Sequence, residues 1–191
     1  PGIIAASQAA CCRVSAEAHR AVMQAIRPGD GEFQVEALVE YLFRNGGCSG
    51  PAYGSIAAGG VNATVLHYTS NDRTLADGEL LLLDAGGEYG GYCGDITRTF
   101  PIGPAYSEPQ ARLYDIVLAA QAAAIDAVKP GATVEAVHNA ALEVLVTGLI
   151  DVGLVHGDVG EAIAKRSYER FYMHRTSHWL GMDVHDAGRY A

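Results

Sequence analysis

The stretch Leu80-Leu-Leu-Leu-Asp-Ala-Gly-Gly-Glu-Tyr-Gly-Gly-Tyr-Cys-Gly-Asp-Ile-Thr-Arg-Thr-Phe100 decides how this chain folds. Its flanks, residues 75–83 and 92–100, carry the apolar and β-branched residues that are typical of strands. A glycine-rich segment separates them, which is the usual signal of a tight connection between strands. The stretch therefore predicts two adjacent antiparallel strands joined by a glycine-rich turn.

Two aspartates, Asp84 and Asp95, stand at the inner ends of these strands. If the chain turns at Tyr89 and Gly90, the two aspartates face each other directly, and like charges in that position are destabilising. One divalent cation, or two bridged by a carboxylate, would compensate the charge with hard oxygen ligands. Alternatively, both aspartates cap a turn, and a slip of one residue in register would place them on opposite faces.

A second polar cluster lies in the run Phe171-Tyr-Met-His-Arg-Thr-Ser-His-Trp-Leu-Gly-Met-Asp-Val-His-Asp186. His174 and His178 have the spacing of a helical zinc motif, but Arg175 stands where that motif requires glutamate. The aromatic residues and glycine of the run favour an extended segment over a helix. We therefore expect no helical zinc site here.

Further along this run, strand alternation would put Asp183 and His185 on one face. A single histidine is more often a structural residue than a ligand, but three within one short segment favour a functional site. His67 is a fourth candidate, and on its own it would be interpreted as an ordinary buried histidine.

Helical spacing of apolar residues predicts two pairs of helices. Helices over residues 7–26 and 107–128 both end at a basic-Pro-Gly turn, and each turn is followed by Val-Glu-Ala and a second helix. The repetition predicts two related halves, each a helix pair followed by strands. Chance is the competing interpretation, because Pro-Gly is a general helix stop.

The composition fits one domain of 191 residues, of which 49% are hydrophobic. The net charge of −9 and the absence of a basic cluster argue against nucleic acid as a partner. The longest apolar runs fall far short of the ~20 residues that span a bilayer, so no membrane helix is expected. The four cysteines lack CxxC spacing, which favours a cytoplasmic location.

These motifs together resemble the Xaa-Pro aminopeptidases (aminopeptidase P) of the pita-bread metallopeptidase superfamily. The resemblance is carried, in order, by the segments 62–68, 83–87, 94–101 and 173–186. It implies an α+β pita-bread fold (creatinase/aminopeptidase-like) with a pseudo-two-fold repeat, and removal of an N-terminal residue that precedes proline. Ser177-His-Trp-Leu-Gly181 is more similar to the bacterial aminopeptidases P than to prolidase.

The resemblance also implies a role for each candidate residue. Asp84, Asp95 and His178 would be metal ligands, with Asp95 bridging two divalent ions, usually manganese. The other three candidate histidines would line the active site, where they position the substrate and move protons. These are His67, His174 and His185.

The family takes two further ligands, both glutamates, from segments that follow the Val-His-Asp motif, and it carries an N-terminal domain before the catalytic domain. We therefore expect residues 1–191 to be a partial, C-terminally truncated catalytic domain that is inactive alone and belongs to a longer, homo-oligomeric protein. The resemblance leaves two alternatives open. One is a prolidase of the same fold, which cleaves Xaa-Pro dipeptides, and the other is a non-catalytic binding module.

Overall fold

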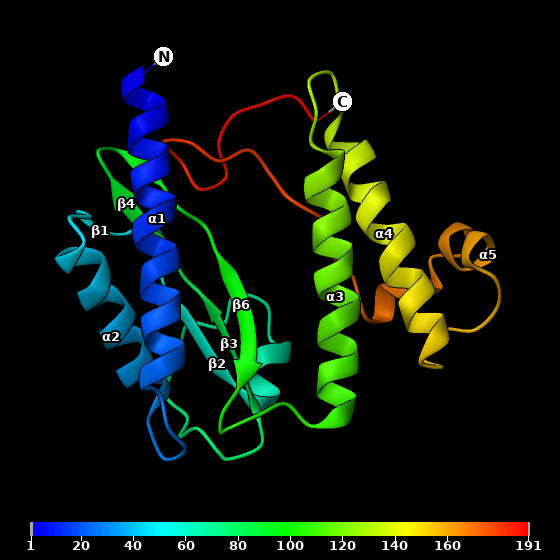
Figure 1. Cartoon of the computed structure of the whole chain (residues 1–191), viewed down its shortest axis with the longest axis horizontal. Helices are drawn as coiled ribbons and strands as arrows, with labels where there is room; N and C mark the ends of the chain where they lie inside the picture. Colours follow the sequence, from blue (N-terminus) through cyan, green and yellow to red (C-terminus); the bar gives the residue numbers. More distant parts are fainter. Residues whose placement is uncertain (1, 191) are drawn as a thin grey trace. The chain divides into compact units, whose positions relative to one another are not determined.

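The computed structural model describes residues 2–190 and divides the chain into two compact units (Figure 1). Unit 1 comprises Pro1–Tyr106 and Trp179–Ala187, and unit 2 comprises Ser107–His178 and Gly188–Ala191. Unit 1 contains both sheets, whereas unit 2 is built from helices. No helix in the described part of the chain is long and apolar enough to cross a membrane.

Unit 1 begins with two helices, α1 (Gly2–Ala25) and α2 (Glu32–Asn45). The apolar spacing predicted the first over residues 7–26 and a second helix after the basic-Pro-Gly turn. Their apolar faces and those of the central strands form one buried cluster, represented by Val22, Val39, Phe43 and Leu81. Burial of apolar side chains is the main source of stability in such a cluster. The cluster holds the sheet that carries the candidate site.

Six strands of the described residues form two antiparallel three-stranded sheets, in the orders β1-β4-β5 and β2-β3-β6. In chain order, the elements of this region are β1 (Gly50–Pro51), β2 (Ile56–Gly59), the 3₁₀ helix η1 (Gly60–Thr64), β3 (Leu80–Asp84), β4 (Gly87–Tyr89), β5 (Tyr92–Cys93) and β6 (Thr97–Pro101). The alternating burial of β3 matches a strand with one face on the core.

The register expected for the glycine-rich hairpin was wrong. Tyr89 pairs with Tyr92, so the turn consists of Gly90 and Gly91, and Asp84 faces Thr97 instead of Asp95. Both turn glycines have positive φ, 59° and 81°, as a two-residue type I′ turn requires at its two central positions. A tyrosine in the first of these positions would be strained, which explains why the turn lies one residue further along the chain.

Unit 2 contains the second helix pair, α3 (Glu108–Ala127) and α4 (Val134–Asp151), followed by α5 (Val159–Ala164) and the 3₁₀ helix η2 (Ser167–Arg170). Helix α3 starts as the sequence predicted, with the backbone N–H of Ser107 donating to Gln110 Oε1 at 2.8 Å. The two helix pairs of the expected repeat are therefore present. The strands expected after the second pair are absent from the described residues 152–190.

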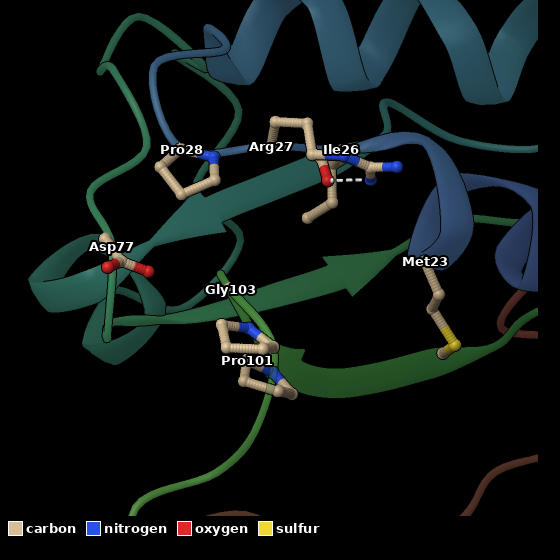
Figure 2. Close-up of a pocket in the computed structure, with 8 residues that line it drawn as sticks. Met23, Ile26, Arg27, Pro28, Asp77, Pro101 and Gly103 are labelled. Atoms are coloured by element: carbon tan, nitrogen blue, oxygen red, sulfur yellow. Dashed lines mark hydrogen bonds between the residues drawn. The ribbon is translucent and has the colours of Figure 1, made fainter.

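A cavity of about 450 Å³ lies in unit 1 near the C-terminal end of α1 (Figure 2). Met23, Ile26, Pro28 and Pro101 give it an apolar lining. The Arg27 guanidinium folds back onto the chain, donating to the backbone carbonyl of Ile26 at 2.6 Å. None of the predicted site residues lines this cavity, so it is separate from the candidate site.

Candidate functional site

A second cavity of unit 1, about 280 Å³ in volume, brings together four of the six predicted site residues. They come from separate segments: the loop after η1, the end of β3, the segment before β6 and the segment 179–187. Two neighbouring side chains complete the polar lining. The polar residues of this cavity are Tyr53, His67, Thr69, Asp84, Asp95 and His185.

The two aspartates meet at the hydroxyl of Tyr53. Tyr53 Oη lies 2.5 Å from Asp84 Oδ1 and 2.9 Å from Asp95 Oδ1. A phenol has one proton to donate, so it can satisfy only one of the two carboxylates at a time. The two aspartates therefore share one hydroxyl, although they are not the directly opposed pair that was expected, because Asp84 faces Thr97.

The close approach of the aspartates depends on the glycines between them. The backbone N–H of Gly94 donates to the carbonyl of Gly87 at 2.9 Å, and that of Ala85 donates to Ile96 at 3.1 Å. A Cβ on Gly86 would lie 1.8 Å from the carbonyl oxygen of Gly94, so only glycine fits at this crossing. The glycine-rich segment is therefore what allows both carboxylates to reach one cavity.

The surroundings of Asp84 disfavour its negative charge. Burial raises the pKa of Asp84, and the charge of Asp95 raises it further, although hydrogen bonds from Tyr53 and Thr97 oppose the shift. Burial also raises the pKa of Tyr53, with the Asp84 charge adding to the effect, so the hydroxyl keeps its proton at neutral pH. Two half-buried carboxylates in such a setting suit a bound divalent cation, which prefers hard oxygen donors.

The segment 179–187 brings His185 to the cavity through contacts with strand β5. The backbone N–H of Cys93 donates to Gly181 O at 2.8 Å, and its thiol lies 3.2 Å from Met182 O. The segment is not the strand that alternation predicted, since the Gly181 N–H donates to Asp183 O at 3.1 Å and closes a tight bend. A Cβ on Gly181 would lie 1.9 Å from Asp186 Oδ2, so the Asp186 carboxylate would have to move to admit a larger residue.

His174 and His178 belong to unit 2, in a segment without helix or strand, which confirms the prediction that this run is not helical. Tyr172 stacks on His138 with ring centroids 6.0 Å apart, and His174 meets Tyr172 edge-on at 5.4 Å. Within the described residues, no group of three or more His, Cys, Asp or Glu side chains is arranged as a metal site. The shared site expected for His178 and the aspartates stays a prediction.

Tyr53 and Thr69 are the polar residues of this cavity that the sequence did not reveal, and Tyr53 is the one that contacts the aspartates. It lies between β1 and β2, in a short connection without any pattern that marks function. Its contacts with Asp84 and Asp95 span 31 and 42 residues of sequence. Only the folded chain shows that the two carboxylates share one hydroxyl.

Changing Tyr53 to Phe is expected to lower the free energy of unfolding of the metal-free protein by about 1–2 kcal/mol, because a half-buried carboxylate loses its donor. Urea unfolding in the presence of a chelator would measure this difference. Tyr41→Phe is the matched control, because Tyr41 is an exposed tyrosine of the same unit. Equal stability of the two variants would contradict the role given to the Tyr53 hydroxyl.

Comparison with known proteins places these features in a family context. Residues 7–191 match metallopeptidase family M24. The chain is 44% identical over 178 residues to the Xaa-Pro aminopeptidase of Haemophilus influenzae, an alignment that covers 93% of this chain and 41% of that protein.

Solved structures agree with this match. The aminopeptidase PepP of Pseudomonas aeruginosa superposes with a TM-score of 0.96 at 48% identity, covering 98% of this chain and 42% of that one. A zinc-substituted Escherichia coli aminopeptidase P in complex with product gives 0.95 at 40% identity, covering 98% and 42%. The expected α+β pita-bread fold is confirmed, and the chain spans about two fifths of the length of these relatives.

Proposed function

Because the chain belongs to metallopeptidase family M24, we propose that it forms part of a dinuclear-metal-dependent exopeptidase that removes the N-terminal residue from peptides with proline in second position. The observation that carries the proposal is the cavity of unit 1, where a carboxylate pair and two histidines meet. The proposed preference for proline in second position is taken from the relatives, which are named Xaa-Pro aminopeptidases.

Asp84 and Asp95 would hold the metal, with Asp95 bridging two ions and His178 binding the second. Three protein ligands are too few for two divalent ions, so we propose that two further carboxylates outside residues 1–191 complete the set. Manganese suits a site of oxygen donors with one imidazole. When bound, such a pair of ions lowers the pKa of water and stabilises an oxyanion.

The residues of the cavity supply binding and proton transfer. A peptide bond to proline has no N–H, so proton donors must reach its nitrogen or its carbonyl in another way. Imidazole exchanges protons near neutral pH, and His67 and His185 face the same cavity as the carboxylates. We assign proton transfer and substrate positioning to these two side chains and to His174, and attraction of the substrate's amino group to the carboxylates.

The cellular setting follows from the cysteines. The four thiols, Cys11, Cys12, Cys48 and Cys93, form no disulfide within the described residues. Unpaired thiols support a reducing compartment, so we propose a cytoplasmic protein. For the longer protein that contains this chain, we propose a homo-oligomer.

The test is a comparison of peptide substrates with a protein that extends residues 1–191 by the two missing carboxylates. We expect turnover of Xaa-Pro-Yaa peptides at least about tenfold above that of Xaa-Pro dipeptides, a discrimination of about 1.4 kcal/mol in the transition state. Xaa-Ala-Yaa peptides are the control and should stay uncleaved. Turnover confined to dipeptides would indicate a prolidase, and no turnover of any peptide by the metal-loaded protein would indicate a binding module.

A further inference from the structure

Glu32 is a fully buried carboxylate of unit 1 that does not line the candidate cavity. It is the first residue of α2 and follows the N-cap residue Gly31. A helix N-terminus favours a negative charge, but a buried carboxylate also requires hydrogen-bond donors around it. The donors around Glu32 come from residues 59–73, so the carboxylate fixes this segment.

Four residues donate to the Glu32 carboxylate. Its Oε1 accepts from the backbone N–H of Gly59 at 2.7 Å and from Asn62 Nδ2 at 3.1 Å. Its Oε2 accepts from the Tyr68 hydroxyl at 2.7 Å and from the backbone N–H of Arg73 at 3.0 Å. Desolvation and the hydrogen bond to Glu32 raise the pKa of Tyr68 to about 12, so this hydroxyl keeps its proton and donates.

All four donors belong to one loop, residues 59–73: Gly59 and Arg73 stand at its two ends, and Asn62 and Tyr68 lie between them. The loop leaves the sheet at Gly59, the last residue of β2. It returns at Arg73, whose carbonyl accepts a hydrogen bond from the Glu32 N–H at 2.9 Å. The Glu32 carboxylate therefore ties both ends of the loop to the start of α2.

Two further side chains attach the returning end of the loop. The Arg73 guanidinium donates to the Gly59 carbonyl at 2.7 Å and to Glu79 Oε1 at 2.8 Å. Asn71 is buried, and its side chain accepts from the Ala57 N–H and donates to the Ser55 carbonyl, both at 2.9 Å. This contact fixes the returning end of the loop. The span that includes residues 62–68 depends on Glu32.

His67 lies within that span and is exposed at the cavity wall. Its φ of 53° is left-handed, a conformation that a non-glycine residue keeps only where its surroundings enforce it. The next residue, Tyr68, is the one whose hydroxyl Glu32 accepts. The hydrogen bond between Tyr68 and Glu32 thus fixes the backbone next to His67.

We propose that Glu32 is a positioning residue of the peptidase site: its carboxylate fixes the loop 59–73 and thereby sets where the His67 imidazole stands in the cavity. This role, which rests on the proposed function, acts through His67 and requires no contact with substrate. Glutamine in place of Glu32 would replace one of the two accepting oxygens with an amide N–H₂, which cannot accept a hydrogen bond. The loop would then lose the hydrogen bonds that this oxygen accepts.

A double-mutant cycle tests this role in the metal-loaded protein that contains the complete ligand set. Glu32→Gln should lower kcat/KM by about 10–100-fold, because displacement of a catalytic group by ~1 Å costs up to about 100-fold. In a His67→Ala background the same change should cost less than about twofold, since the group it positions is gone. Glu36→Gln, the same substitution one turn further along α2, is the control and should leave activity unchanged. Equal losses in both backgrounds would overturn the proposal.

A readout without peptide turnover separates this role from the proposed function. In protein labelled with ¹³C-histidine, the ring signal of His67, assigned by its loss in His67→Ala, should shift or broaden in Glu32→Gln, while that of buried His138 stays unchanged. An unchanged His67 signal overturns the proposal even if peptides are cleaved. If the protein cleaves no peptide, only the proposed function fails. The His67 signal then still tests whether Glu32 positions the His67 imidazole.

A milder variant covers the case in which Glu32→Gln does not fold. Tyr68→Phe removes one of the donors from a half-buried position and keeps the carboxylate. It should move the His67 signal in the same direction and lower kcat/KM by about 3–10-fold, the effect of one lost hydrogen bond. A Tyr68→Phe protein with unchanged signal and unchanged kcat/KM would also overturn the proposal.

Discussion

Asp95→Asn is expected to release both divalent ions together and to lower kcat/KM by more than about 100-fold, since loss of an outer-shell partner alone costs about 10–100-fold in metal affinity or activity. Asparagine keeps the size of the side chain but removes the charge and one of the two anionic oxygens. If Asp95 bridges the ions, neither is held without it. The measurement is metal content after equilibrium dialysis of the protein with its complete ligand set.

Asp77→Asn is the matched control for this variant. Asp77 is exposed at the other cavity of unit 1, away from the candidate site, and its change should leave two equivalents of metal in place. Loss of a single equivalent in Asp95→Asn would contradict the bridging role, and an unchanged metal content would remove Asp95 from the ligand set.

Gly86→Ala is expected to lower the free energy of unfolding by more than about 3 kcal/mol, because overpacking against backbone cannot be relieved by a side-chain rotation. The added Cβ would lie 1.8 Å from the Gly94 carbonyl oxygen and 2.3 Å from its carbon. The two segments that carry Asp84 and Asp95 would have to separate. Urea unfolding with a chelator present would measure the loss, and metal binding should weaken in parallel.

Gly91→Ala separates this clash from the general cost of replacing a glycine. Gly91 has a φ of +81° and nothing within 4 Å of an added Cβ, so alanine there meets backbone strain alone, about 1–2 kcal/mol. If Gly86→Ala were no more destabilising than Gly91→Ala, the close crossing of the two segments would be contradicted.

The hairpin shows how far local pattern leads. The strand flanks and the glycines between them predicted two antiparallel strands, and β3, β5 and β6 confirm them. The register was missed because Tyr89 and Gly90 were taken as the turn, whereas Gly90 and Gly91 supply both positive φ angles. The Gly-Gly pair was a usable signal, since a type I′ turn requires positive φ at both central positions and glycine adopts it readily.

The segment 179–187 shows where local pattern fails. Alternating polar and apolar residues predicted a strand, but Cys93 and the bend at Gly181 hold the segment instead. The Cys93 contacts join residues far apart in sequence, which no local pattern reveals. His185 still reaches the cavity, because the contact with Cys93 and not a strand face brings it there.

By itself, the sequence determined the helix pairs, the glycine-rich hairpin and the residue types that suit a metal site, because these depend on neighbours a few positions away. Only the tertiary structure decided that Tyr53 joins Asp84 to Asp95 and that Glu32 closes the loop that carries His67. Both depend on hydrogen bonds between residues 27 to 42 positions apart. Such partners carry no periodic signal, since what pairs them is the requirement that a buried polar group be satisfied wherever the fold brings a donor.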